Sequence, residues 1–220
     1  MSDQHSHTGQ TWRLEHDSLG DVRVPADRYW GAQTERARHR FQIGNDPIPL
    51  ELIHAIACLK RMAAHTNHQL GVLDEQRCQW ISEAAREVEG GKLDGEFPLS
   101  CWQSGSGTQT NMNVNEVIAN RACELAGQAR GSRDVVHPND HVNRSQSTND
   151  VFPCAIHLAA ERQQRQALLP ALHQLVEALE SKAAAWDGVV KIGRTHLQDA
   201  VPLTVGQEVG GWAAQLRSAG

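Results

Sequence analysis

The feature that most constrains the fold is a helical pattern of apolar residues running from about Asp150 to Trp186 of the 220-residue sequence. Pro153 falls near its first turn, where proline is tolerated, but Pro170 lies inside and should kink the helix or divide it in two. A pattern this long is typical of a bundle helix that packs against several others. Its apolar positions are Ile156, Ala159, Ala160, Leu168, Leu172, Leu175, Val176 and Leu179.

Three shorter helices are expected before this pattern and one after it. Their apolar stripes, spaced as on one helix face, cover residues 52–63, 81–88, 114–125 and 205–216. Asp74 and Thr204 are the expected N-caps of the second and the last. Glycines at positions 71, 90 and 127 are natural stops for the first three.

The remaining segments predict little regular structure. Residues 12–24 carry Ser18-Leu19-Gly20-Asp21 between two short runs, which favours a small β-hairpin arm. Residues 188–201 are expected to form a polar loop. We therefore predict an all-α fold in three parts: a disordered tail (1–11), a mainly helical N-terminal domain (12–146), and the first helices of a long central bundle (147–220). Because two bundle helices cannot enclose a core, we expect the chain to be truncated.

Composition narrows the partners and the compartment. The net charge is −5 and the pI is near 6.2, so no basic field favours nucleic acid or an anionic membrane surface. The five cysteines are odd in number and widely spaced, without a Cys-x-x-Cys pair, which suits a reducing compartment. No apolar run approaches the ~20 residues needed to span a bilayer, and the first twenty residues lack a leader pattern. The sequence therefore predicts a cytoplasmic protein.

Three polar segments lie between the predicted helices. In the first, residues 105–116, two glycines and the hydroxyls of Ser106 and Thr108 lead into a helix N-terminus, which is a natural anion site. An ordinary serine/threonine cap is the alternative. Asn111, Asn113 and Asn115 cannot share one helix face at ~100° per residue, so at least two should meet different buried partners. This spacing predicts a polar interior beside the loop.

The second and third segments precede helices as well. Residues 143–150 place short hydrogen-bond donors directly before the long helix, which fits either a carboxylate site or a simple N-cap cluster. The third, residues 191–202, contains His196 among Thr195, Gln198 and Asp199, which could orient its ring and set its protonation state. A surface histidine is the alternative. His196 is the best acid–base candidate in the chain.

The sequence does not support a metal site or a nucleotide-binding site. His137 and His141 are four residues apart, but Pro138 disfavours the helical geometry that two such ligands need. His65 and His68 have no cysteine or clustered acid beside them. The sequence also contains no phosphate-binding loop and no Gly-x-Gly-x-x-Gly. We therefore expect neither a metal site nor nucleotide chemistry.

Taken together, the three segments resemble the class II fumarate hydratases of the fumarase/aspartase superfamily. The resemblance extends over 19–27, 29–34, 96–99, 105–122, 136–153 and 190–208. It implies a nearly all-helical enzyme with a central bundle, assembled as a homotetramer whose active sites are shared between subunits. It also implies reversible addition of water to fumarate, giving L-malate, as in the tricarboxylic acid cycle, without a metal or organic cofactor.

The resemblance also implies roles for individual residues. His196 would donate and accept the proton through a bound water. The substrate-binding residues would be Ser106, Gly107, Thr108, Ser147, Thr148, Asn149 and Thr195. A second dicarboxylate site would comprise His137, Pro138, Asn139 and Asp140. Ser104 stands where the family pattern has threonine, and it keeps the hydroxyl.

One catalytic segment of the family pattern is not found in the sequence. The family takes the C–H proton with a serine on a loop of the form Gly-Ser-Ser-x-Met-Pro-x-Lys-x-Asn, and its subunits are about twice as long as this chain. We therefore expect an N-terminal half that is inactive alone. Aspartate ammonia-lyase is the nearest alternative, but its third segment resembles Gly-Arg-Thr-Gln, whereas this chain has Thr195-His196. A non-catalytic helical association module is the alternative of another class.

Overall fold

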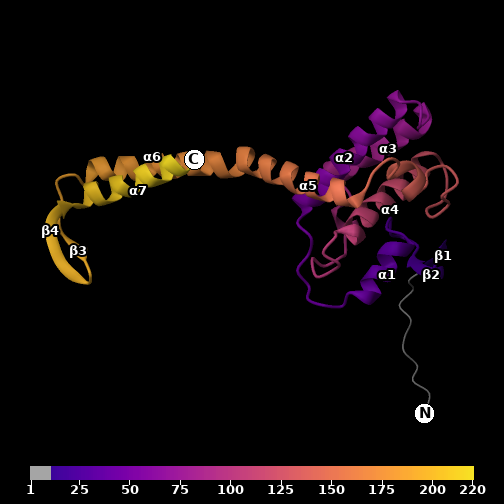
Figure 1. Cartoon of the computed structure of the whole chain (residues 1–220), viewed down its shortest axis with the longest axis horizontal. Coiled ribbons are helices and arrows are strands. Elements are labelled where there is room, and N and C mark those ends of the chain that lie inside the picture. The colour runs from indigo at the N-terminus through magenta and orange to yellow at the C-terminus, as the bar shows by residue number, and fades with distance from the viewer. Residues whose placement is uncertain (1–10) are drawn as a thin grey trace, which may run out of the picture. The chain divides into compact units, whose positions relative to one another are not determined.

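The computed structural model describes residues 11–220, so the predicted tail falls almost wholly outside the described residues. The chain divides into two compact units, 1–159 and 160–220, and each is described by itself. The described residues are mainly helical with two small antiparallel hairpins (Figure 1), which confirms the helical fold class. The predicted boundary between residues 146 and 147 stays a prediction.

The first unit opens with the predicted hairpin arm. Strand β1 (Trp12–Asp17) pairs antiparallel with β2 (Gly20–Pro25), from Asp17 opposite Gly20 to Trp12 opposite Pro25. The backbone N–H of Leu19 donates to the Asp17 carboxylate (2.8 Å), which closes the turn. A Ser-Leu-Gly-Asp sequence between two short strands is thus sufficient to form a hairpin here.

The helices of this unit follow the apolar pattern closely. Asp74 caps its helix as predicted, accepting a hydrogen bond from the backbone N–H of Arg77 (2.9 Å). One helix, α1, is not predicted, because its sequence has many charged residues and no clear apolar stripe. The helical elements are α1 (Ala32–Arg40), α2 (Leu50–Gln69), α3 (Glu75–Glu89), the 3-10 turn η1 (Asp94–Glu96), α4 (Thr108–Leu125), the π-turn η2 (Pro138–Val142) and α5 (Thr148–Gln163).

Helix α4 lies at the centre of this unit. It packs against α1, α2 and α3, and α2 and α3 pack along each other as a pair (Figure 1). Since α4 has protein on most sides, both its apolar and its polar side chains are buried along most of its length. The core that encloses it includes Ile53, Ile56, Ile81, Val88, Val114, Val117, Ile118 and Ala122.

The second unit contains the later part of the long helical pattern. Helix α5 gives way to a π-helical turn, η3 (Gln164–Leu168), which leads directly into α6 (Leu169–Ala185). Pro170 falls in the first turn of α6. Because proline has no N–H and its ring crowds the preceding turn, the backbone changes its hydrogen-bond pattern just before it. This confirms the predicted division at Pro170.

The predicted polar loop at 188–201 is wrong. Strand β3 (Val190–Thr195) and strand β4 (Gln198–Thr204) form a second hairpin, in which Val190 pairs with Thr204 and Thr195 with Gln198. The strands were missed because most of their side chains are exposed, so no alternation of buried and exposed residues marks them. A proline within β4 also argues against a strand by the usual rules.

Helix α7 (Val205–Ala219) begins at Thr204 as predicted. The Thr204 hydroxyl accepts from the Gln207 backbone N–H (3.0 Å), and the Gln207 side chain accepts from the Thr204 N–H (3.1 Å), which is a complete capping box. The helix then packs along α6. Gly206 permits this close approach, since a Cβ there would lie 2.8 Å from the backbone nitrogen of Asp187. None of the described helices combines the length and hydropathy that a bilayer crossing requires.

Candidate functional site

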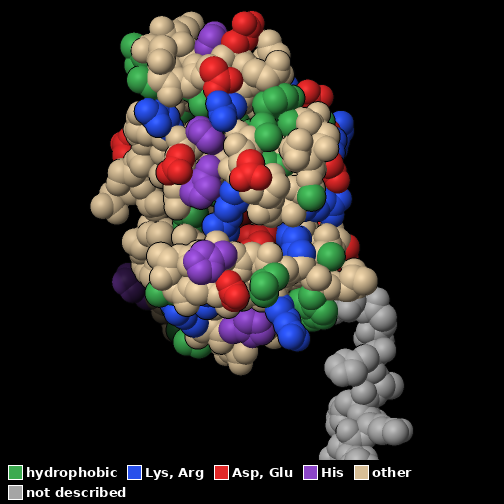
Figure 2. All heavy atoms as spheres, turned by 90° about the vertical axis from the view of Figure 1, so that its right-hand side faces the viewer, with side chains coloured by type: hydrophobic (Ala, Val, Ile, Leu, Met, Phe, Trp, Pro, Cys, Tyr) green, Lys and Arg blue, Asp and Glu red, His purple; other side chains and the backbone are tan. Residues whose placement is uncertain are grey.

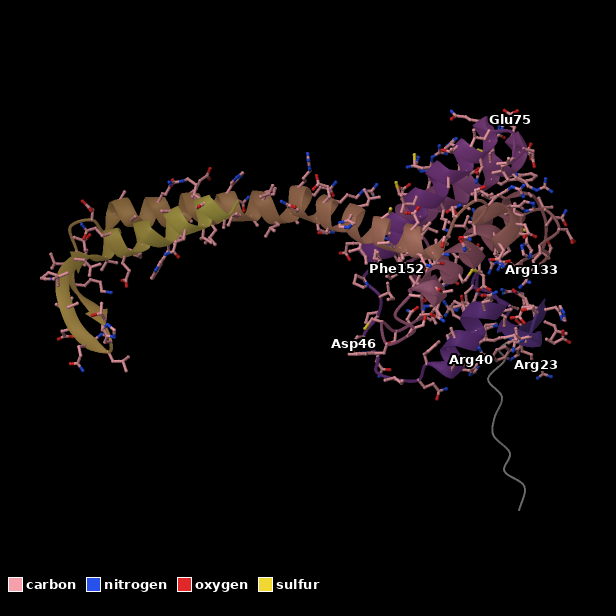
Figure 3. The ribbon with its side chains drawn as sticks, in the orientation of Figure 1. Arg23, Arg40, Asp46, Glu75, Arg133 and Phe152 are labelled. Carbon is pink, nitrogen blue, oxygen red and sulfur yellow. The ribbon has the colours of Figure 1, made fainter. Side chains whose placement is uncertain are left out.

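The first polar segment leads into α4 through a left-handed residue, Gly107, whose φ is +68°. A Cβ at this position would lie 2.5 Å from the ring of Phe152, which stands near the start of α5 (Figure 3). The beginnings of α4 and α5 therefore touch at Gly107. Only glycine supplies both the positive φ and the absent side chain at this contact.

Gly107→Ala is expected to destabilise the chain by about 1–3 kcal/mol, because the added methyl group overpacks against the Phe152 ring. The measurement is the free energy of unfolding by urea. Gly105→Ala is the matched control, since a Cβ at Gly105 meets nothing within 4 Å. Equal stability of the two variants would contradict this reading of the contact.

Three hydroxyl groups form a row in front of α4. The Ser104 and Ser106 Oγ atoms are 3.1 Å apart, and Ser106 Oγ is 2.9 Å from Thr108 Oγ1. Ser106 and Thr108 are exposed, while Ser104 is held by the side chain of Gln109. Exposed hydroxyls at a helix N-terminus are suited to bind an anion, because the helix dipole and the free N–H groups also favour negative charge.

The interior behind this row is polar, as predicted from the asparagine spacing. Asn111, Asn113 and Asn115 are all at most 1 % exposed. The Asn113 amide donates to the backbone carbonyl of Glu96 (3.0 Å), while Asn111 and Asn115 each donate to Asn143 Oδ1 (3.2 Å). The prediction of different buried partners is confirmed.

The second polar segment meets the first through one of these amides. Asn111 Nδ2 donates to Thr148 Oγ1 (2.9 Å) at the start of α5. Because the Thr148 oxygen accepts this bond, its own proton remains available for another acceptor. In the same turn the Asn149 backbone N–H donates to Ser147 Oγ (3.3 Å), and both of these residues are exposed. The structure thus brings the first two segments together.

A buried lysine beneath this junction was missed by the sequence reasoning. Lys60 of α2 is fully buried, and its Nζ donates to Asn143 Oδ1 (2.8 Å). Burial lowers the pKa of Lys60 from 10.5 to about 7, since the charged form is poorly solvated. The signal was present in the sequence: residue 60 falls on the helical stripe that contains Ile53, Ile56 and Ala64.

The segment from His137 to His141 has a defined histidine geometry. His137 Nδ1 accepts from the backbone N–H groups of Asn139 and Asp140 (3.2 Å each), and His141 Nδ1 accepts from the His137 N–H (2.8 Å). In the neutral form both rings therefore carry their proton on Nε2. Burial lowers the pKa of both histidines, which favours that neutral form. Within the described residues, no group of three or more His, Cys, Asp or Glu side chains could hold a metal ion.

The third segment lies in the second unit, at the turn of its hairpin. His196 and Leu197 occupy the two turn positions, with φ values of +49° and +61°. Such turns normally carry Asn-Gly or similar pairs, so a histidine followed by a leucine is held in an unfavourable conformation. Both residues, like Thr195, are exposed. Asp199 pairs with Arg194 (3.3 Å) instead of orienting the imidazole as predicted.

Comparison with known proteins identifies the family of this chain. A family model described as "Lyase" matches residues 20–219. The chain belongs to the lyase family. Among members of this family, it is 59 % identical over 207 residues to "Fumarate hydratase class II" of Thermosynechococcus vestitus and 57 % identical over 209 residues to that of Thermus aquaticus. These matches confirm the resemblance predicted from the motifs.

Solved lyase structures agree with the sequence matches. The crystal structure of a class II fumarase from Schistosoma mansoni aligns with a TM-score of 0.90 at 48 % identity and covers 95 % of this chain. The chain spans less than half the length of these relatives: 44 % of the Thermosynechococcus protein, 45 % of the Thermus protein and 44 % of the Schistosoma chain.

Proposed function

We propose that this chain supplies part of the active site of a class II fumarate hydratase, which adds water reversibly to fumarate to give L-malate. The observation that carries the proposal is the junction of two helix starts, where the hydrogen bond from Asn111 to Thr148 joins two hydroxyl-bearing segments. The class II names of relatives at 54–59 % identity support the same reaction.

The residues suit the chemistry in defined ways. Removal of a proton beside a carboxylate builds a dianionic aci-carboxylate, so hydrogen-bond donors must be aimed at its oxygens in advance. Ser106, Thr108 and Thr148 supply hydroxyl donors for this purpose, and a bond to a charged group contributes ~1.5–3 kcal/mol. His196 would activate water as the acid–base group, because an imidazole can both accept and donate a proton.

The assembly and setting are also part of the proposal. We infer a cytoplasmic homotetramer with active sites shared between subunits and no organic cofactor. The five cysteines, none of which forms a disulfide, are consistent with a reducing compartment. The face shown in Figure 2 intersperses basic with acidic side chains, so it offers no single-sign field for nucleic acid or an anionic membrane. The second dicarboxylate site would comprise His137, Pro138, Asn139 and Asp140. The Nε2–H group of His137 would donate to the anion there.

The experiment that tests the function uses fumarate absorbance in the ultraviolet. We expect no hydration of fumarate by the 220-residue chain alone, because the Gly-Ser-Ser-x-Met-Pro motif is not found in its sequence. Co-expression with the C-terminal half of the Thermosynechococcus relative should restore some activity. Turnover by the isolated chain would refute the need for the loop.

The co-expressed protein also distinguishes the two alternative functions. Ammonia-dependent turnover of fumarate would favour aspartate ammonia-lyase. No binding of fumarate would favour a helical association module.

Thr108→Val tests the carboxylate site. The change is nearly isosteric but removes one hydroxyl, so fumarate and competitive dicarboxylates should both bind more weakly by ~1–3 kcal/mol. The measurement is the inhibition constant of such dicarboxylates in the co-expressed enzyme. Thr66→Val, an exposed position on α2, is the matched control. Unchanged inhibition constants would show that Thr108 does not bind substrate.

A further inference from the structure

The ammonium group of Lys60 is an unusual group to find in the interior of this unit. Its side chain is fully buried, and its one hydrogen-bond partner among the described residues is the neutral Asn143 side chain (2.8 Å). Across the part of the chain that the structure describes, no carboxylate forms an ion pair with it. A buried charge without a counter-ion is costly, so its presence calls for a functional explanation.

A chain of hydrogen bonds leads from this cation to the surface. Asn143 Oδ1 accepts from Lys60 and also from Asn111 Nδ2 (3.2 Å), and Asn111 Nδ2 in turn donates to Thr148 Oγ1 (2.9 Å). Lys60 lies on α2, Asn111 on α4 and Thr148 on α5, and Asn143 lies between η2 and α5. Asn111 Nδ2 therefore donates inward to Asn143 and outward to Thr148, so the Thr148 hydroxyl keeps its own proton for an acceptor at the surface. The positive charge of Lys60 favours an anionic acceptor there.

The amides around Lys60 leave its charge uncompensated. The side-chain oxygens of Asn111 and Asn115 are buried and have no hydrogen-bond partner within the described residues. They are neutral dipoles, and they do not supply the full negative charge that a buried ammonium group needs. An anion bound at the start of α5 would supply that charge from outside.

We propose that Lys60 is a positioning residue that complements a substrate carboxylate bound at Thr148 and Asn149, acting through Asn143 and Asn111. The inference rests on the proposed function only for the identity of the anion, a small dicarboxylate such as fumarate. Lys60 does not touch the ligand. Its charge favours the anion across the interior, and its hydrogen bond fixes the amides that orient the Thr148 hydroxyl.

The test is a nuclear magnetic resonance titration of the 220-residue chain, labelled at backbone amides and at lysine side chains. The sequence has four lysines, so the Lys60 side-chain signal can be identified by its loss in Lys60→Met. Fumarate should shift the Thr148 and Asn149 amide signals and the Lys60 signal together. Acetate is titrated separately as a simple monocarboxylate probe.

Two variants remove the charge in different ways. At pH 6, where Lys60 with its pKa of about 7 is mostly charged, Lys60→Met should weaken anion affinity about tenfold, because a positive charge is removed from the interior. Asn143→Asp keeps the lysine but gives it an ion-pair partner, and should weaken the affinity similarly even if Lys60→Met fails to fold. Lys92→Met, at an exposed position, is the matched control and should bind as the unmodified chain does.

Each outcome separates the inference from the proposed function. Equal fumarate affinity in the unmodified chain and in both charge variants would overturn the role of Lys60 and leave the proposed function standing. Lys60-dependent binding of acetate without binding of fumarate would support the inference and count against fumarate as substrate. If neither anion shifts the Thr148 and Asn149 signals, the inference fails, and the proposed function is decided separately by the fumarate assay of the co-expressed halves.

Discussion

Replacing His196 with asparagine in the co-expressed enzyme is expected to lower kcat by about 10²–10⁴-fold while changing KM far less. Asparagine approximates the shape and polarity of the imidazole but does not exchange a proton near neutral pH. Loss of the acid–base group therefore acts on the transition state more than on substrate binding. Steady-state kinetics in both reaction directions would measure this split.

The backbone at residue 196 provides an internal control for the same variant. Asparagine adopts positive φ more readily than most residues, so His196→Asn should keep the hairpin turn intact and leave thermal stability equal or slightly higher. A fall in kcat would then reflect lost chemistry and not a lost fold. A change confined to KM would contradict the proposed role of His196.

Replacing Lys60 with methionine should stabilise the chain at neutral pH, by roughly 1–4 kcal/mol. Methionine fills a similar volume without the cost of burying an ammonium group. The measurement is the free energy of unfolding in urea, with Lys92→Met as the exposed control. A lysine kept for structural reasons would give the opposite sign, because its removal would destabilise the interior.

The stabilisation by Lys60→Met should depend on pH in a defined direction. The pKa of Lys60 is lowered from 10.5 to about 7 in the folded chain, so between these values the unfolded state binds a proton that the folded state does not. The unmodified chain therefore gains stability as pH rises through this window. The advantage of methionine should be largest below about pH 7 and fade toward pH 10. A pH-independent difference would mean that Lys60 titrates normally.

Much of the fold could be predicted because its signals are local. The helices α2, α3 and α4 follow from apolar stripes, the cap at Asp74 from its position before such a stripe, and the change in helix type before Pro170 from the missing N–H of proline. The burial of Asn113 and its neighbours also followed from helix geometry alone. In each case the signal lies within a few residues of the chain, although the partners of the buried asparagines, Glu96 and Asn143, are distant in sequence.

The parts that could not be predicted either carry no local sequence signal or depend on contacts distant in sequence. The hairpin that carries His196 has exposed strands, so it lacks the alternating pattern that marks a half-buried sheet. Helix α1 is rich in charged residues, and the backbone N–H groups at its N-terminus donate to the Glu116 carboxylate of α4. No pattern in the sequence near α1 predicts this distant partner. The hydrogen bond between Asn111 and Thr148 likewise joins two segments 37 residues apart.

The three buried amides of α4 fix the rotation of that helix about its own axis. Asn111 and Asn115, one helical turn apart, both donate to Asn143 Oδ1, whereas Asn113 donates to the Glu96 carbonyl on another side. A rotation of the helix would therefore break contacts on two sides at once. A single-residue insertion within α4 would rotate the following residues by ~100° and separate the amides after it from their partners. Insertions are therefore tolerated more easily in the hydroxyl-bearing loop at 104–107 than in the helix that follows it.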